Sequence, residues 1–200
     1  MPDWDEDSPQ LRDNLRALLR AIRDAARRRE ALSVETIREW HRLMLDRLTP
    51  PNPHWSGAFR GEPGLEGIEV RVGRGHGLPA KKVHAALQHF EERLDKLVSY
   101  LDHHIEAGTK LDGDKISAVL HACAWAHAEW VRIHPFANGN GRSARLLANA
   151  LAMRYGLPPF ARLRPRPNDG YGEAAAAAMR GDSSPTLAWM QLALRTALED

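Results

Sequence analysis

The residues best suited to chemistry lie in one run of twelve, His134 to Arg145, which reads His-Pro-Phe-Ala-Asn-Gly-Asn-Gly-Arg-Ser-Ala-Arg. A histidine whose unperturbed pKa is about 6.5 accepts a proton from a hydroxyl group near neutral pH. Arg142 and Arg145 are three residues apart, so in a helix their guanidinium groups lie on one face, as binding a di- or triphosphate requires. The run therefore predicts an anion site with a base at its edge.

The backbone of this run also suits an anion. Gly139 and Gly141 permit positive φ and leave their N–H groups unobstructed, and Asn140 tolerates the same backbone region. We expect a helix from Arg142 to about Tyr155, whose positive end would face the loop. The alternative is an ordinary turn between two helices, since glycine and asparagine are common in turns.

The two residues on either side of Pro135 have different expected roles. A residue before proline favours an extended backbone, so we expect His134 to be extended and to end the preceding helix. We expect Phe136 to point inward and to hold the loop rigid by packing.

At every fixed position but one, the run resembles the signature of the Fic (Fic/Doc) family, His-x-Phe-x-[Asp/Glu]-Gly-Asn-Gly-Arg-x-x-Arg. The resemblance implies an all-α, Fic-type helical bundle with a small β-hairpin flap. It also implies a protein adenylyltransferase, which transfers AMP from ATP, with Mg²⁺ or Mn²⁺, to a Ser, Thr or Tyr hydroxyl of a target protein docked on the flap.

Carried over to this sequence, the family pattern gives each residue of the run a role. His134 is the general base, and Arg142 stabilises charge on the phosphates. The nucleotide-binding residues are Phe136, Gly139, Asn140, Gly141, Arg142 and Arg145. Asn138 stands where the family has an acidic metal ligand; its amide oxygen can bind a hard cation but lacks the negative charge of a carboxylate.

Two other functions stay open. Phosphoryl or other nucleotidyl transfer by a Fic/Doc-type toxin is one, although Gly141 stands where kinase-type members have lysine. A catalytically weakened, Fic-fold binding module is the other, supported by Asn138. The inhibitory motif [Ser/Thr]-x-x-x-Glu-[Gly/Asn] of many family members does not occur in this sequence. An antitoxin-like inhibitor chain, or an enzyme without such inhibition, would explain its absence.

Length and composition fit one globular domain. The chain has 200 residues and a net charge of only +2, which argues against nucleic acid as a partner. Its single cysteine, Cys123, fits a reducing compartment. Because it has no long apolar run and begins with an acidic segment, we expect no membrane contact and a bacterial cytoplasmic location; an injected effector is the alternative.

Hydrophobic periodicity predicts an N-terminal helix in residues 1–32, packed on a Fic domain at 33–200. Ser8, Ser33 and Asp114 are expected N-caps, and Pro79 is expected to open a helix. The predicted helices are Pro9 to about Glu30, Ser33 to Arg47, Pro79 to about His104, Lys115 to Ile133, Arg142 to Tyr155, Tyr171 to Met179, and Thr186 to Leu198.

A hairpin flap is predicted at about 55–79, because Ile68, Val70 and Val72 alternate with polar residues. Gly57-Ala-Phe-Arg60 resembles the start of the family's flap, Gly-x-[Phe/Tyr]-Arg. The alternative is a surface loop without strand pairing.

Several polar residues outside the run are not expected to take part in chemistry. His41 is expected in the core, and His121, Cys123 and His127 are expected to be core residues rather than zinc ligands, because their spacing does not bring all three to one ion. Arginines on one side of the first helix, at 12, 16, 20, 23 and 27, are either a solvated face or a surface for an acidic partner. Arg162, Arg164 and Arg166 face either the nucleotide or solvent.

Overall fold

The computed structural model describes residues 8–72 and 75–199. Within these ranges the chain is mainly helical, as predicted, with one short hairpin. The helices are α1 (Pro9–Arg27), α2 (Val34–Met44), α3 (Ala80–His104), α4 (Gly113–Ile133), α5 (Asn140–Arg154), α6 (Tyr171–Ala178) and α7 (Ser184–Glu199), with a 3-10 turn, η1, at Pro53–Trp55. The strands are β1 (Arg71–Val72) and β2 (Gly75–His76).

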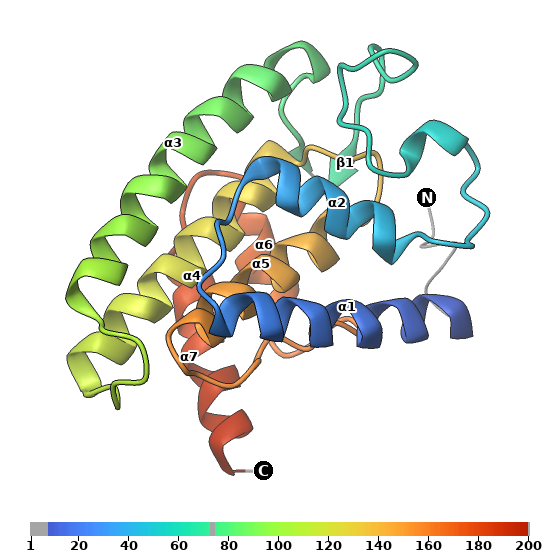
Figure 1. Cartoon of the computed structure of the whole chain (residues 1–200). Helices are drawn as coiled ribbons and strands as arrows, with labels where there is room; N and C mark the ends of the chain where they lie inside the picture. The colour runs from blue at the N-terminus through green and yellow to red at the C-terminus, as the bar shows by residue number, and fades with distance from the viewer. Residues whose placement is uncertain (1–7, 73–74, 200) are drawn as a thin grey trace.

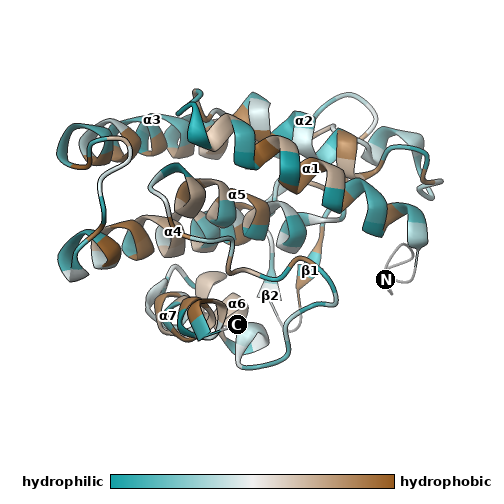
Figure 2. Ribbon diagram, turned by 60° about the horizontal axis from the view of Figure 1, so that its bottom comes forward, coloured by the Kyte–Doolittle hydropathy of each residue, from teal (hydrophilic) through white to brown (hydrophobic). Residues whose placement is uncertain are grey.

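The helices form three layers around α5 (Figures 1 and 2). Helices α1, α2 and α3 lie on one side of α4 and α5, and α6 and α7 lie on the other. Helix α5 is buried along almost its whole length, and it packs against α4, α1 and α2. The sequence predicted that α4 is central, and its contacts with α3, α5, α6 and α7 confirm this. No helix within 8–72 and 75–199 has the length and apolar character of a membrane span.

The helix boundaries follow the caps. Ser8 and Ser33 cap α1 and α2 as predicted, accepting from the N–H groups of Leu11 and Thr36 at 3.4 and 3.0 Å. The predicted cap of α4 was wrong. Asp112, not Asp114, accepts from the N–H of Lys115 at 2.9 Å, so α4 begins at Gly113.

Helix α5 also begins two residues earlier than predicted, at Asn140, because Gly139 takes a left-handed conformation (φ 78°) and serves as its N-cap. Helix α2 ends at Met44, three residues before the predicted Arg47.

The flap is smaller than the predicted hairpin at 55–79. Within the described residues, the strands are Arg71–Val72 and Gly75–His76, which pair antiparallel with Arg71 opposite His76. Ile68, Val70 and Val72 are half-buried and Glu69 and Arg71 exposed, as the alternation predicted. Residues 56–67 instead form turns, anchored by the buried side chains of Phe59 and Leu65.

Arg60 ties this segment to the end of α4. Its side chain, 1% exposed, donates from Nε to the carbonyl of His134 (2.7 Å) and from Nη2 to those of Ile133 (3.1 Å) and Leu78 (2.8 Å). A fourth bond, from Nη1, reaches the carbonyl of Ile68 at 3.2 Å. A cation is favourable here, because the carbonyl end of a helix carries partial negative charge. Arg60 therefore joins both ends of the flap to the C-terminus of α4.

We predict that Arg60→Ala lowers the free energy of unfolding by about 3 kcal/mol or more, because four carbonyl groups lose their donor. Urea denaturation measures this change. Arg71→Ala, which removes an exposed arginine from the same segment, is the control and should change stability by less than about 0.5 kcal/mol. Equal effects of the two substitutions would contradict the role of Arg60.

Candidate active site

The run from His134 to Arg145 links α4 to α5, in the middle layer of the fold. The sequence predicted an extended backbone at His134, but this prediction was wrong. The residue has a left-handed backbone conformation (φ 54°, ψ 58°). Its N–H donates to the carbonyl of Trp130 at 2.9 Å, so it terminates α4 as a C-cap, a position where left-handed residues are common. The bond from Arg60 to the His134 carbonyl supports this conformation. These hydrogen bonds at the end of α4 outweigh the preference of a residue before proline for an extended backbone.

The imidazole of His134 is held as a neutral base. Its Nδ1 lies 3.1 Å from the carbonyl of Val131, an acceptor, so Nδ1 carries the proton and the lone pair is on Nε2. Burial lowers the pKa of His134 to about 4, and the nearby positive charge of Arg60 also lowers it. At neutral pH the ring is therefore unprotonated and able to accept a proton.

Asn140 and Phe136 fix the shape of the loop. The Asn140 side chain accepts from the N–H of Phe136 and donates to its carbonyl, both at 2.8 Å. Because these two bonds hold the Asn140 side chain against the loop, we expect Asn140 to bind an anion through its backbone N–H. Asn140 and Gly141 begin α5, where N–H groups have no acceptor within the helix. Phe136 is fully buried, as predicted.

His41 of α2 supports the loop from behind. Its ring stacks on Phe136, with centroids 3.7 Å apart, and its Nε2 donates to the carbonyl of Asn138 at 3.0 Å while Nδ1 accepts from the N–H of Gly57 at 3.1 Å. Burial lowers the pKa of His41 to about 3, so this neutral tautomer persists. The sequence predicted a core histidine but not its bonds to the loop and the flap, which arise between segments far apart in the chain.

The two arginines of the run are both buried, Arg142 at 4% and Arg145 at 3% exposure. Burial lowers the pKa of both His41 and His127, and the positive charges of Arg142 and Arg145 add to this at His41 and His127, respectively. Arg145 donates to the carbonyl of Leu163 at 3.1 Å and lies over the Tyr171 ring, 4.9 Å from its centroid. The first two turns of α5 thus carry two buried cations.

Tyr171 and His127 form a second support, which was not predicted as such. The Tyr171 hydroxyl is 3.1 Å from Nε2 of His127 and 3.5 Å from the carbonyl of Gly141. Cys123 is also buried, as predicted, but His121 is exposed, so its assignment to the core was wrong. His121 falls on the solvent side of α4 because the core stripe passes through 119, 120, 123 and 127.

The loop offers a metal ion one neutral oxygen. The amide oxygen of Asn138 accepts from the N–H of Gly139 at 2.6 Å, and an amide oxygen has two lone pairs in all. Among residues 8–72 and 75–199, no three His, Cys, Asp or Glu side chains are grouped as a metal site. Mg²⁺ is commonly held by one or two carboxylates and by substrate phosphates. The fit is therefore limited to Asn138, and phosphates would supply most of the ligands.

The flap lies directly beside the base. A methyl group added to Gly77 would be 2.8 Å from Cβ of His134 and 2.9 Å from Cγ2 of Val70. The N–H of Gly77 donates to the carbonyl of Val70 at 3.1 Å, which extends the hairpin pairing to this point. Only glycine allows the strand to approach His134 this closely.

Comparison with known proteins agrees with this geometry. The model of the Fic/DOC family matches residues 31–152. The protein adenylyltransferase Fic of Aedes aegypti is 32% identical over 128 residues, which cover 64% of this chain and 21% of that protein. The enzyme of the same name from Nematostella vectensis is 44% identical over 70 residues, or 34% of this chain and 16% of that one. The chain thus spans about a fifth or less of these relatives.

Solved structures show the same fold. The BepC protein of Bartonella tribocorum, with bound AMPPNP, aligns with a TM-score of 0.61 and 16% identity over 92% of this chain and 86% of that one. A Fic-domain signaling protein of Bacteroides thetaiotaomicron aligns with a TM-score of 0.55 and 19% identity over 96% of this chain and 73% of that one.

These findings define the class of protein: a helical domain with a glycine-containing loop between its two central helices, α4 and α5. The chain belongs to the Fic/DOC family. The division into residues 1–32 and 33–200 stays a prediction.

We predict that Gly77→Ala lowers the free energy of unfolding by about 1–3 kcal/mol, because the new methyl group overlaps His134 and Val70. Thermal or urea denaturation tests this. Gly67→Ala, in the same segment but with no atom within 4 Å of the added carbon, is the matched control and should be nearly neutral. A neutral Gly77→Ala would mean that the flap does not lie against His134.

Proposed function

We propose that this domain transfers AMP from ATP to a Ser, Thr or Tyr hydroxyl group of a target protein. The observation that carries the proposal is the tautomer of His134, whose Nε2 is unprotonated, at the start of a loop that leads into a helix with two buried arginines. The names of the relatives from Aedes aegypti and Nematostella vectensis support adenylyl transfer, and the AMPPNP bound to BepC supports ATP as the nucleotide.

In the proposed step, Nε2 of His134 takes the proton of the target hydroxyl as its oxygen attacks the α-phosphorus of ATP. The new bond joins that oxygen to phosphorus, and the bond from phosphorus to the bridging oxygen breaks, releasing pyrophosphate. Arg142, Arg145 and the N–H groups of the first turn of α5 stabilise charge on the phosphates. Bound Mg²⁺, with Asn138 as its protein ligand, would neutralise further phosphate charge.

The flap is proposed as the docking edge for the target. An extended segment pairing with the hairpin would lie beside Gly77, and therefore beside His134. We also propose that an antitoxin-like chain inhibits the domain; the support for this is the lack of the family's inhibitory motif in the sequence.

Labelled ATP tests the reaction directly. With ATP labelled at the α-phosphate, Mg²⁺ and a cell lysate, we expect a labelled protein whose mass increases by one AMP group. His134→Ala should abolish labelling, and His89→Ala, on the exposed side of α3, should not. In a parallel reaction with ATP labelled at the γ-phosphate, transfer of label would indicate a kinase. If label is transferred from neither position, the domain is a binding module without catalytic activity.

The pKa of His134 predicts an unusual pH dependence. The neutral ring is the base, so activity is lost as pH falls through the pKa, and that pKa is lowered to about 4. We therefore expect kcat/KM to show no loss attributable to His134 between about pH 8 and 5.5, whereas a histidine of ordinary pKa would lose most of its activity there. NMR titration of the nucleotide-free protein, assigned with His134→Ala, checks the pKa itself. A midpoint near 6.5 would contradict the burial of this ring.

Asn138→Asp tests the metal ligand. A carboxylate at this position adds negative charge, so we expect half-maximal activity at a Mg²⁺ concentration about tenfold lower. Asn168→Asp, which adds the same charge at an exposed position, is the control. An unchanged Mg²⁺ dependence would show that Asn138 does not contact the ion.

A further inference from the structure

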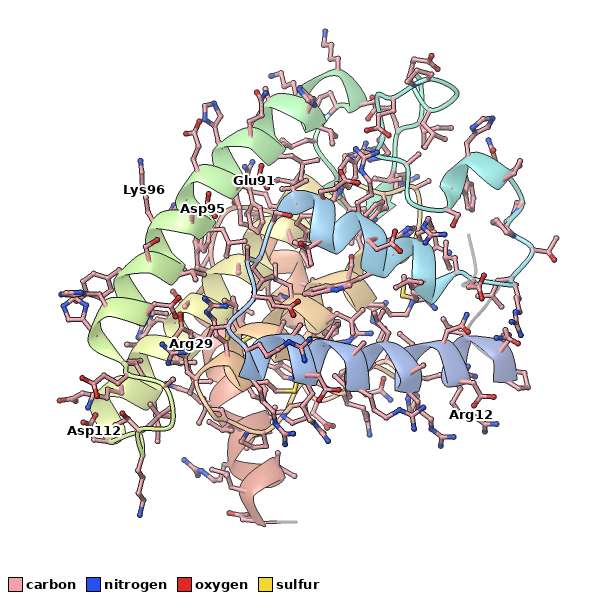
Figure 3. All side chains as sticks on the ribbon, in the orientation of Figure 1. Arg12, Arg29, Glu91, Asp95, Lys96 and Asp112 are labelled. Carbon is pink, nitrogen blue, oxygen red and sulfur yellow. The ribbon has the colours of Figure 1, made fainter. Side chains whose placement is uncertain are left out.

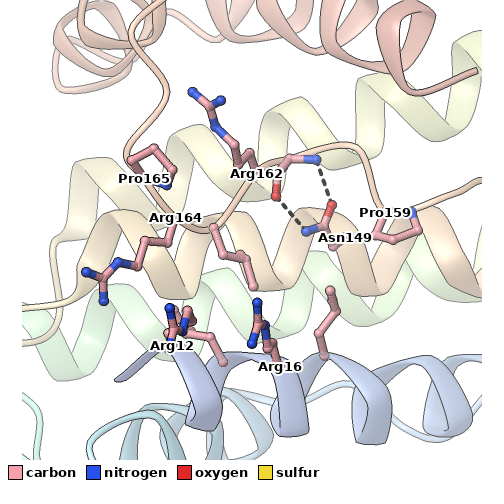
Figure 4. Close-up of a pocket in the computed structure, with 11 residues that line it drawn as sticks. Arg12, Arg16, Asn149, Pro159, Arg162, Arg164 and Pro165 are labelled. Atoms are coloured by element: carbon pink, nitrogen blue, oxygen red, sulfur yellow. Dashed lines mark hydrogen bonds between the residues drawn. The ribbon is translucent and has the colours of Figure 1, made fainter. Parts of the chain in front are cut away.

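A hollow of about 360 Å³ lies between α1 and the segment 159–165, which we call the connector (Figure 4). Its interior is largely apolar, formed by Leu15, Leu19, Pro159, Ala161, Leu163 and Pro165. Asn149 of α5 also lines it, but its side chain accepts from the N–H of Ala161 at 2.9 Å and donates to the carbonyl of Ala161 at 2.8 Å. The interior therefore suits an apolar group.

Four arginines surround this hollow: Arg12 and Arg16 from α1, and Arg162 and Arg164 from the connector (Figure 4). Arg164 donates to the carbonyl of Ser8 at 2.7 Å. Arg12 and Arg16 approach Asp13 at 3.9 and 3.7 Å, in contacts so exposed that solvent screens them. Arg162 is exposed and makes no hydrogen bond or ion pair within the described part of the chain. The exposed charges of Arg12, Arg16 and Arg162 thus make the rim positive.

The positive surface extends beyond the hollow along α1. Arg20, Arg23 and Arg27 follow Arg12 and Arg16 at helical spacing on the same exposed face, and Figure 3 shows Arg12 projecting away from the body of the protein. From Arg12 to Arg27 this face is about 23 Å long at the rise of an α-helix. A small anion would contact only one end of it, so the surface matches a longer partner.

We propose that α1 and the connector form a docking surface for an acidic helical segment of a partner protein. An apolar side chain of that segment fills the hollow, and carboxylates on either side of it face the arginines of α1 and the connector. Nucleic acid fits less well, because among the described residues the hollow is lined by aliphatic, proline, asparagine and arginine side chains, and none of these offers an aromatic ring to stack on a base. This surface is separate from the flap and does not depend on the proposed reaction.

The surface has a direct link to the active site. The carbonyl of Leu163, in the connector, accepts from Arg145, while the Leu163 side chain lines the hollow. A segment docked here therefore touches the part of the chain that holds the second arginine of the loop.

A labelled helical peptide about as long as α1, with glutamates along one face and a leucine at its centre, is the probe. We expect it to bind the full chain and to lose at least about tenfold in affinity for Arg16→Glu/Arg162→Glu, since attraction becomes repulsion at both sides of the hollow. Arg195→Glu/Arg180→Glu, the same charge change at exposed positions outside the surface, is the control. Equal affinities for the two double variants would overturn the proposal.

A second comparison tests the hollow. Replacing the central leucine of the peptide by serine should weaken binding to the unmodified chain but not to Leu19→Gln, in which the hollow has lost an apolar wall. An oligonucleotide that binds more tightly than the peptide would overturn the choice of a protein partner. Peptide binding seen only after removal of residues 1–7, which are acidic, would assign the surface to this chain's own N-terminus instead.

Discussion

The active site depends on the way in which Arg60 binds the end of α4. A helix terminus leaves several carbonyl groups without partners, and here two of them, those of Ile133 and His134, accept from one buried guanidinium group. The same group holds Ile68 and Leu78, at the two ends of the flap. A single cation thereby places the base and the hairpin together, and it also helps to keep the base unprotonated.

The loop that follows is shaped by its own bonds rather than by a ligand. Asn140 binds both polar groups of Phe136, and His41 binds the Asn138 carbonyl while stacking on Phe136. These contacts are buried and neutral, so they persist without nucleotide. A site prepared in this way needs little rearrangement when phosphates arrive, which is the condition for effective electrostatic stabilisation.

Much of this could be predicted from local sequence. The helices follow hydrophobic periodicity, and Ser8 and Ser33 mark two of their starts. The run at 134–145 identified the loop through its glycines and arginines. Features set by distant contacts were not predictable. Nothing beside His41 indicates that it meets Asn138, and nothing beside His134 indicates that the end of α4 outweighs the effect of Pro135. The flap was predicted too long because alternation of side chains does not ensure a pairing partner.

The burial of Arg142 and Arg145 within the most enclosed helix has a consequence for how this protein can change. Two buried like charges next to the positive end of a helix dipole repel one another, and contacts such as those of Arg145 with Leu163 and Tyr171 must offset that cost. Exchanging either for an apolar residue of similar size would remove this repulsion, and it would also remove the counter-charge for a polyphosphate. Selection for stability alone would therefore act against Arg142 and Arg145, whereas selection for binding of a polyphosphate would retain them.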